Sequence, residues 1–332
     1  MRSASWVMVA TLGPLLVGCG GDAEPSKGSA GNGGALSNGG GATSGGGGGG
    51  GGAAGAVTSG GGGSAIGGGA SPASCTGAFN AAEPVLRAPM DTSVNGVSLT
   101  ADELELYYTR DFEVTATPTP EVVRRKRASK DALFGEAESL PELAGVCGDK
   151  LRIYPDVSED GLTLYVTCTT RVDEGSEGVS VLRVARRAGR SEPFVLAAEP
   201  AGNVFAAAGI AADELTAYTD GEVFDTAPQM FTRSSKAEPF MGPMAVPGID
   251  VPFRSPDVSS DGLTLFGAAG RDIIHIYRAH RADANAAFST PEPIDLKLSE
   301  ATIGAPNITA GCALYVVVVT SEGYTVQRAL MQ

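Results

Sequence analysis

The sequence is poor in the residues on which metal and nucleophilic chemistry usually depend. It has two histidines and five cysteines among 332 residues, and no Cys-x-x-Cys spacing occurs. His275 and His280 fall on one expected strand at an odd spacing, which places them on opposite faces. A zinc site is therefore not expected. No G-x-S-x-G elbow, P-loop or dinucleotide fingerprint stands in a context that would use it, so we expect no cofactor and no catalysis.

Positive charge is also scarce. The chain carries 24 Lys and Arg against 38 Asp and Glu, a formal net charge of −14. An acidic surface of this kind argues against nucleic acid as a partner. One basic cluster, Arg124-Arg125-Lys126-Arg127, departs from the trend. We interpret it as a solvated strand and loop.

Long hydrophobic runs are lacking after the N-terminus. The single apolar stretch, Val7–Val17, comes after Arg2 and is too short to span a bilayer. It ends in Leu16-Val17-Gly18-Cys19, which resembles the bacterial lipobox, in which the cysteine thiol receives a diacylglyceryl group. The sequence therefore predicts a signal peptide over residues 1–18 and a bilayer anchor at Cys19. The residue directly after Cys19 is Gly20 and not Asp, which favours the outer membrane, with the domain facing either the periplasm or the cell surface.

The segment that begins at Cys19 is low-complexity sequence. Residues 19–74 are nearly all Gly, Ser, Ala, Asn and Thr, and Gly45–Gly52 is unbroken glycine. Such a segment cannot bury enough apolar surface to fold, so we expect a disordered tether with an end-to-end distance of roughly 40 Å. Residues 75–332 remain as one domain, long enough for a substantial core and expected to be monomeric.

The domain repeats itself. The stretch "SEDGLTLYVT" at Ser158–Thr167 returns as "SSDGLTLFGA" at Ser259–Ala268, and three weaker copies begin at Thr100, Ala211 and Thr309. Each copy places a turn between two apolar strands, and Asp160-Gly161 and Asp261-Gly262 are strong hairpin signals. The copies end in a column of aromatic residues about fifty residues apart: Tyr107, Tyr165, Tyr218, Phe266 and Tyr315.

Further strands complete each copy. A third strand comes after the aromatic residue, and a fourth begins at a phenylalanine and carries a proline, which suits an edge strand. Four antiparallel strands per repeat predict an all-β propeller with five four-stranded blades. The last copy lacks its fourth strand, and Phe79–Val85 has the missing pattern. We therefore expect the N-terminal strand to close the ring through the last blade; a six-bladed ring is the alternative.

The repeat resembles the WD40-like repeat of the TolB type, with its "P-x-x-S-x-D-G-x-x-L-Y" core. The match runs from Pro155 to Tyr165 and from Pro256 to Phe266, while the copies at Thr100, Ala211 and Thr309 lack the glycine. The resemblance covers most of residues 75–332. It implies a propeller fold and, among the families that share it, scaffold proteins of the cell envelope.

Four cysteines remain after Cys19, and they allow three pairings. Cys147 precedes the first strand of the second copy and Cys168 ends its second strand, so the hairpin brings them close together. We predict a Cys147–Cys168 bond, which leaves Cys75 to pair with Cys312 and to fasten the closing segment to the last blade.

Two carboxylates occupy equivalent positions on the inner strands. Asp156 and Asp257 could line the central channel as the acid and base of a glycoside hydrolase. Their repetition argues instead for a structural role, since a catalytic pair needs two different environments. The sequence therefore favours a non-catalytic binding or scaffold module of the cell envelope, with an unknown protein or glycan ligand; a channel-centred glycoside hydrolase is the alternative.

Overall fold

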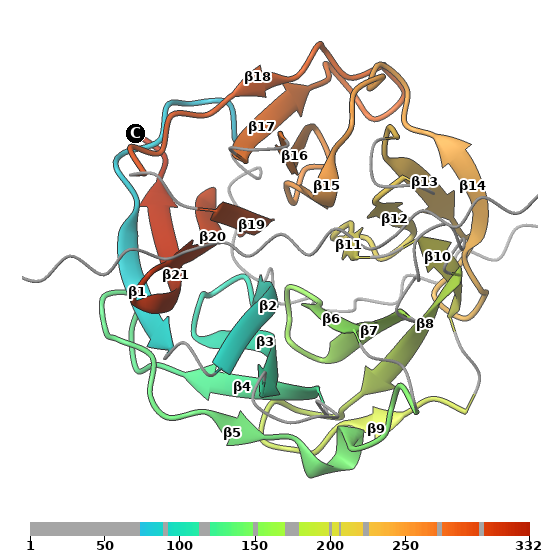
Figure 1. Ribbon diagram of the computed structural model, residues 1–332. Coiled ribbons are helices and arrows are strands. Elements are labelled where there is room, and N and C mark those ends of the chain that lie inside the picture. Colours follow the sequence, from blue (N-terminus) through green and yellow to red (C-terminus); the bar gives the residue numbers. More distant parts are fainter. Residues whose placement is uncertain are drawn as a thin grey trace, which may run out of the picture. The chain divides into compact units, whose positions relative to one another are not determined.

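The chain folds into a ring of antiparallel sheets, shown in the computed structural model of Figure 1. The structure describes residues 74–88, 92–112, 120–148, 152–169, 179–198, 201–205, 207–221, 226–270, 274–298 and 302–332. The predicted signal peptide, Cys19 and all but the last residue of the predicted tether lie outside these ranges. In the described part, no helix is long and apolar enough to cross a membrane.

Five sheets form the blades, and each runs outward from the centre of the ring. Blade 1 is β2 (Thr92–Leu99), β3 (Glu105–Phe112), β4 (Glu121–Lys126) and β5 (Glu138–Ser139). Blade 2 is β6 (Arg152–Val157), β7 (Thr163–Thr169) and β8 (Val179–Arg186), with β9 (Val195–Leu196) and β10 (Gly202–Phe205) after them. Blade 3 is β11 (Ala208–Ile210), β12 (Thr216–Thr219), β13 (Gln229–Thr232) and β14 (Met241–Ala245). Blade 4 is β15 (Arg254–Val258), β16 (Thr264–Ala269), β17 (His275–His280) and β18 (Glu292–Pro293). Blade 5 is β19 (Thr302–Ile308), β20 (Ala313–Thr320), β21 (Gly323–Leu330) and β1 (Glu83–Ala88).

The five-bladed prediction is confirmed, and so is the closure of the ring by the N-terminal strand. In Figure 1 the cyan strand β1 lies beside the red strand β21. Their register pairs Glu83 with Arg328 and Ala88 with Tyr324, and a bridge joins Phe79 to Met331. The last blade therefore takes three strands from one end of the chain and one from the other.

The outer strands differ from the prediction in length. β5, β9 and β18 contain two residues each, because the chain around each of them is mostly irregular. Pro141 begins a short 3-10 helix (η1, Pro141–Leu143) instead of lying in the strand. Blade 2 gains a fifth strand, since β9 and β10 both pair with β8.

The core lies between the blades. Every residue of β7 is buried, because the sheets on both sides cover its two faces. The predicted aromatic column is fully enclosed, each member being at most 2% exposed: Tyr107, Tyr165, Tyr218, Phe266 and Tyr315. Burial of such large apolar side chains contributes about 1.5–3 kcal/mol apiece, so the seams between blades carry much of the stability.

Four of the seams also contain an arginine stacked on a phenylalanine seven residues later. The guanidinium carbon lies 4.3 to 4.6 Å from the ring centroid in the four pairs Arg127–Phe134, Arg187–Phe194, Arg233–Phe240 and Arg281–Phe288. In three of them, Phe194, Phe240 and Phe288, the phenylalanine packs edge-on against the aromatic residue of the preceding blade, as Phe194 does against Tyr107 at 6.1 Å. Phe79 takes this place in blade 5 and lies 6.2 Å from Phe266.

Both predicted disulfides are present. Cys147 is bonded to Cys168, 21 residues away, and Cys75 to Cys312, 237 residues away. The second bond attaches the first turn of the described domain to the inner hairpin of blade 5.

Candidate functional site

The centre of the ring is built from one residue of each inner strand. These residues stand two positions before the Ser, Thr or Ala that opens the hairpin turn, so the repeat itself brings them to one level of the channel. They are Ser98, Asp156, Gly209, Asp257 and Asn307.

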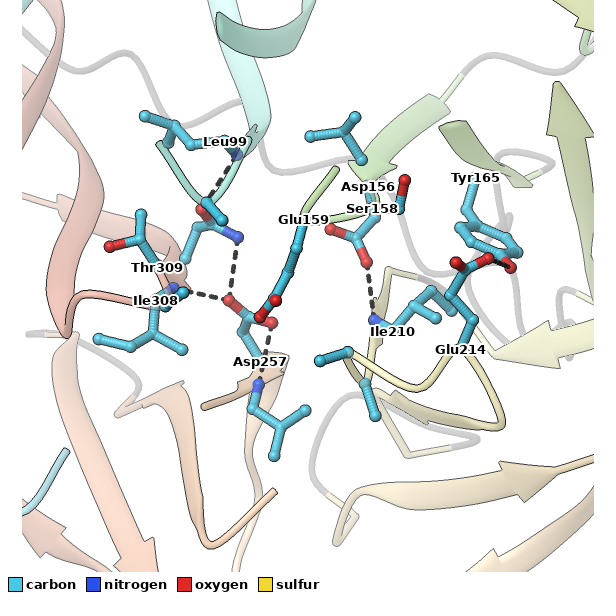
Figure 2. A pocket seen from close by; sticks show the side chains of 17 residues that line it. Leu99, Asp156, Ser158, Glu159, Tyr165, Ile210, Glu214, Asp257, Ile308 and Thr309 are labelled. Carbon is cyan, nitrogen blue, oxygen red and sulfur yellow. Dashed lines mark hydrogen bonds between the residues drawn. The ribbon is translucent and has the colours of Figure 1, made fainter. Parts of the chain in front are cut away.

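Hydrogen bonds run from blade to blade at this level. The Asp156 carboxylate accepts a bond from the Ile210 backbone N–H of blade 3 at 2.7 Å and from the Ser98 hydroxyl of blade 1 at 2.8 Å. Asp257 accepts from the Ile308 N–H of blade 5 at 2.7 Å. Figure 2 shows the bonds from Ile210 and Ile308 as dashed lines.

The same bond recurs at two more of the junctions. Ser98 Oγ accepts from the Val157 N–H at 2.9 Å, and Asn307 Oδ1 accepts from the Leu99 N–H at 3.2 Å. In each case the side chain at the channel satisfies the N–H one residue further along in the next blade. These side chains therefore join consecutive inner strands, which have no ladder hydrogen bonds between them.

The junction between blades 3 and 4 breaks the pattern. Gly209 has no side chain to offer, and a Cβ there would lie 3.0 Å from Asp257 Cα and closer still to the Pro256 carbonyl oxygen. The Val258 N–H bonds instead to the carboxylate of its neighbour Asp257, at 2.9 Å. Asp257 thus accepts from two backbone N–H groups and from the Asn307 amide, 2.9 Å away.

The two channel carboxylates have unequal surroundings, and both bind protons more tightly than usual. Burial raises the pKa of Asp156 to about 6. Burial, and then the charge of Asp156, raises the pKa of Asp257 well above its usual value. Desolvation penalises the charged form of each group more than the hydrogen bonds favour it. The pair therefore titrates as a unit.

Little space is open beside these carboxylates. A cavity of about 30 Å³ lies on the side of the hairpin turns and another of about 30 Å³ on the opposite side. Each is about the volume of one water molecule. Above the first, Glu159 of blade 2 accepts a hydrogen bond from Ser260 of blade 4, which bridges the mouth of the channel. The structure thus brings Asp156 and Asp257 together in the channel, as channel-facing carboxylates whose oxygens are occupied by inter-blade bonds.

The predicted turn residues do form the hairpins. Asp160 accepts bonds from the Ser158 hydroxyl and the Leu162 N–H. Asp261 accepts the equivalent bonds from Ser259 and Leu263. Gly161 and Gly262 adopt positive φ. The equivalent residues in the three degenerate copies also adopt positive φ without being glycine: Glu103, Glu214 and Cys312.

The two glutamates at these turns are buried ion-pairing centres, which the sequence patterns did not reveal. Glu214 accepts a bond from the Tyr165 hydroxyl of blade 2 at 2.6 Å and from Lys236 at 2.6 Å. Glu103 accepts from Tyr315 of blade 5 at 2.7 Å. Burial alone would raise the pKa of Glu103, but bonds from Tyr315 and Lys130 and the charge of Arg328 hold it below its usual value.

The interpretation of the basic cluster was wrong at Arg127. This side chain is 6% exposed, donates to the Glu103 carbonyl at 2.6 Å and pairs with the Glu103 carboxylate at 3.2 Å. The spacing that identifies it is available in the sequence, since an arginine precedes a phenylalanine by seven residues in four repeats. His275 is exposed, and His280 is half-buried and lies 3.4 Å from the Thr264 hydroxyl. Among the described residues, no group of three or more His, Cys, Asp and Glu side chains could hold a metal ion.

Known structures share the propeller ring with this chain. No family model and no curated protein matches the sequence. The structure of the GH43_1 enzyme from Xanthomonas citri complexed with xylotriose superposes with a TM-score of 0.52 at 13% identity, over 74% of this chain and 89% of that one. A structure from the GH130 family of mannoside phosphorylases, described as containing glycoside hydrolases that target β-1,2 mannosidic linkages in Candida mannan, superposes with a TM-score of 0.50 at 12% identity, over 76% and 93%.

The similarity to TolB itself is weak. TolB from Acinetobacter baumannii matches at 11% identity with a TM-score of 0.38, over 73% of this chain and 55% of that one. This similarity is too low to identify the repeat as TolB-type, which stays a prediction, although the propeller itself is established by the sheets.

The expectation that the chain is not an enzyme is overturned by the likeness to the GH43_1 and GH130 structures. These likenesses concern the fold alone, but the fold they share with this chain is a five-bladed ring that carries glycoside hydrolases. The fold alone therefore gives no ground for excluding catalysis.

Proposed function

We propose that this chain is a lipid-anchored module of the bacterial outer membrane that binds a glycan or protein of the cell envelope. The observation that carries the proposal is the place of Cys75. This residue comes directly after the Gly-rich stretch in the sequence and is disulfide-bonded to Cys312 on the inner hairpin of blade 5. A closed and cross-linked ring at the end of a long tether is suited to searching a volume around its anchor for a ligand.

The anchor is tested by labelling cells with a palmitate analogue. The wild-type chain should carry label and sediment with the outer membrane, and the Cys19→Ser chain should do neither. An unlabelled wild-type chain would contradict the anchor. Protease added to intact cells then releases the propeller only if it faces outward, which distinguishes the cell surface from the periplasm.

Binding is tested separately with the purified full chain. Co-sedimentation with isolated cell walls and with outer-membrane vesicles should retain the folded chain but not the urea-unfolded one. If neither fraction retains it, the binding proposal fails. A positive fraction identifies the envelope layer that holds the ligand.

A second candidate is glycoside hydrolysis by the channel carboxylates. It is favoured by the unequal surroundings of Asp156 and Asp257 and by the raised pKa of both. Asp257, kept protonated, would act as the acid and Asp156 as the base. Weighing against it, both side chains bond to neighbouring strands and the adjacent cavities hold about 30 Å³ each. Hydrolysis of xylan or mannan oligosaccharides that disappears in Asp257→Asn would establish it.

A further inference from the structure

A larger hollow than those at the channel lies at the opposite end of blade 4 from its Asp-Gly turn. Its volume is about 430 Å³, and its walls come from the segment that leads into β15, the end of β16, the middle of β17 and the loop before β18. The residues that give it its character are Pro252, Phe253, Arg254, Tyr277, Thr290 and Pro291. We call this hollow the blade 4 groove.

The groove exists because blade 3 is short. Strand β12 ends at Thr219, one residue after Tyr218, whereas β16 runs to Ala269, three residues past the equivalent Phe266. The face of blade 4 that looks toward blade 3 contributes Phe253 and Tyr277 to the same core cluster as Tyr218. Beyond the end of β12 no described strand of blade 3 covers this face, and Tyr277 is half-buried there.

The floor of the groove is preformed. The ring of Phe253 is 1% exposed and lies 6.4 Å from the ring of Tyr277, with the planes inclined at 44°. A Cβ at Gly267 would lie 2.6 Å from the Phe253 ring, so the absence of a side chain there lets the ring settle on the sheet. A rigid apolar floor of this kind loses little entropy when a ligand binds.

Hydroxyl groups stand at the rim. Within the described part of the chain, neither the Tyr277 hydroxyl nor the Thr290 hydroxyl has a hydrogen-bond partner. Both can donate and accept. Among the described residues of the wall, Arg254 alone is charged, and it lies close enough to Asp220 to lower the pKa of that carboxyl against the effect of burial. The groove thus combines an apolar floor, one half-buried aromatic ring and two hydroxyls that are unpaired within the described part of the chain.

This chemistry fits a neutral sugar. A pyranose presents a C–H face that can lie on an aromatic ring and a rim of hydroxyls that pair with protein hydroxyls. A volume of about 430 Å³ falls in the ordinary range of ligand sites, and a net charge of −14 opposes polyanionic ligands. A proline-rich peptide docks between several exposed aromatics, but of the two aromatic residues in the described wall Phe253 is buried and Tyr277 is half-buried.

We propose that the blade 4 groove binds a neutral saccharide ring, stacked on Tyr277 and hydrogen-bonded by the hydroxyls of Tyr277 and Thr290. The inference rests on the proposed binding function and names its ligand class and its place on the ring. The groove lies on the side of blade 4 that faces blade 3. It is at the end of β16, whereas the turn at Asp261 and Gly262 is at the start of that strand.

The test is calorimetric titration of the purified full chain with xylotriose, mannotriose, cellotriose and chitotriose. At least one should bind, Tyr277→Ala should weaken that binding tenfold or more, and Tyr277→Phe and Thr290→Ala should each weaken it severalfold. Tyr324→Ala, which removes a half-buried tyrosine from blade 5, is the matched control and should leave the affinity unchanged. Tyr277→Phe removes only the hydroxyl, and Thr290→Ala removes the hydroxyl and the methyl group of an exposed side chain. These two variants therefore remain informative if Tyr277→Ala does not fold.

Three results would overturn the inference. One is that none of the four trisaccharides binds. Another is that a trisaccharide binds the wild type and all the groove variants equally, in which case the binding function stands and only the groove is wrong. The third is that decaproline binds in place of the sugars and is lost in Tyr277→Phe, which would make the groove a peptide site.

Discussion

Cys312 is bonded to Cys75 at the position where each of the other four blades has an arginine hydrogen bond. In blade 2, for example, Arg187 Nε donates to the carbonyl of Gly161 at 2.7 Å, and Gly161 is the counterpart of Cys312 in the repeat. Blade 5 has Met331 where the arginine would stand, and Met331 accepts a bond from the Gly77 N–H. The disulfide therefore holds the inner turn of blade 5 in place of the arginine hydrogen bond. Blade 5 is the blade whose outer strand comes from the N-terminal end of the domain.

Loss of this bond should destabilise the ring more than loss of the other disulfide. In the chain-entropy model a loop of 237 residues contributes about 5 kcal/mol and one of 21 residues about 3 kcal/mol. We expect the Cys75→Ser, Cys312→Ser variant to unfold at lower urea than the Cys147→Ser, Cys168→Ser variant, as measured by circular dichroism. Equal midpoints would show that β1 is held by its strand pairing with β21 alone.

The seam arginines should differ in their contribution according to their acidic partners. Arg187 is buried and pairs with Glu105 at 2.7 Å, so its removal leaves a buried carboxylate without its main partner. Loss of one member of a buried pair costs about 3–5 kcal/mol. Arg281 makes the same stack and carbonyl bond, but it has no ion pair within the described part of the chain. Urea unfolding should show Arg187→Ala to be clearly less stable than Arg281→Ala, and the reverse order would refute the role of the ion pair.

The sequence predicted the number of blades and the closure because both depend on patterns that every repeat must keep. The turn motif and the aromatic column recur because each blade buries equivalent side chains against its neighbour. The channel bonds were harder to predict: Ser98, Asp156, Gly209, Asp257 and Asn307 share a position but not a chemistry. Four of them place a side-chain acceptor at one level of the channel, and Gly209 lacks even that.

The degenerate copies show a second limit on what the sequence of one repeat can predict. Glu103 and Glu214 stand where a glycine is expected, at φ values of 58° and 59°. Each adopts a backbone conformation that is strained for a residue with a side chain, and its carboxylate is hydrogen-bonded to the buried tyrosine of the preceding blade. A single repeat cannot reveal this exchange, because the tyrosine that benefits lies in another repeat.

The channel carboxylates should make the domain less stable as pH rises. The folded-state pKa of Asp156 is about 6 against a usual value of 3.8, so the folded state binds the proton more tightly. The stabilisation is complete below pH 4 and is lost as pH rises through about 6. A shift of this size corresponds to about 3 kcal/mol. Asp156→Asn should reduce the loss of stability with rising pH, because the amide does not titrate. The variant should still fold, since the amide oxygen can accept from the Ile210 N–H as Asn307 does from Leu99.

Urea titrations at pH 4 to 8 measure this effect. Asp160→Asn is the matched control, because it makes the same carboxylate-to-amide change in an exposed turn outside the channel. A wild-type domain whose stability rises steadily between pH 4 and 7 would contradict the prediction. Asp220, whose pKa burial raises to about 7, adds a decline of the same sign and should remain visible in Asp156→Asn.

Gly209 should tolerate no side chain, because two inner strands meet there without one. A Cβ would overlap the carbonyl oxygen of Pro256 and lie 3.0 Å from Asp257 Cα, and neither backbone atom can yield without moving a strand of blade 4. Gly209→Ala should therefore cost about 1–3 kcal/mol or more, as overpacking does, and should disturb the bonds of Asp257. Gly304, also on an inner strand, would have nothing within 4 Å of its Cβ, so Gly304→Ala should be neutral or stabilise by up to about 1 kcal/mol. The two variants make the same chemical change, so equal unfolding midpoints would mean that blades 3 and 4 do not meet as closely as the channel bonds require.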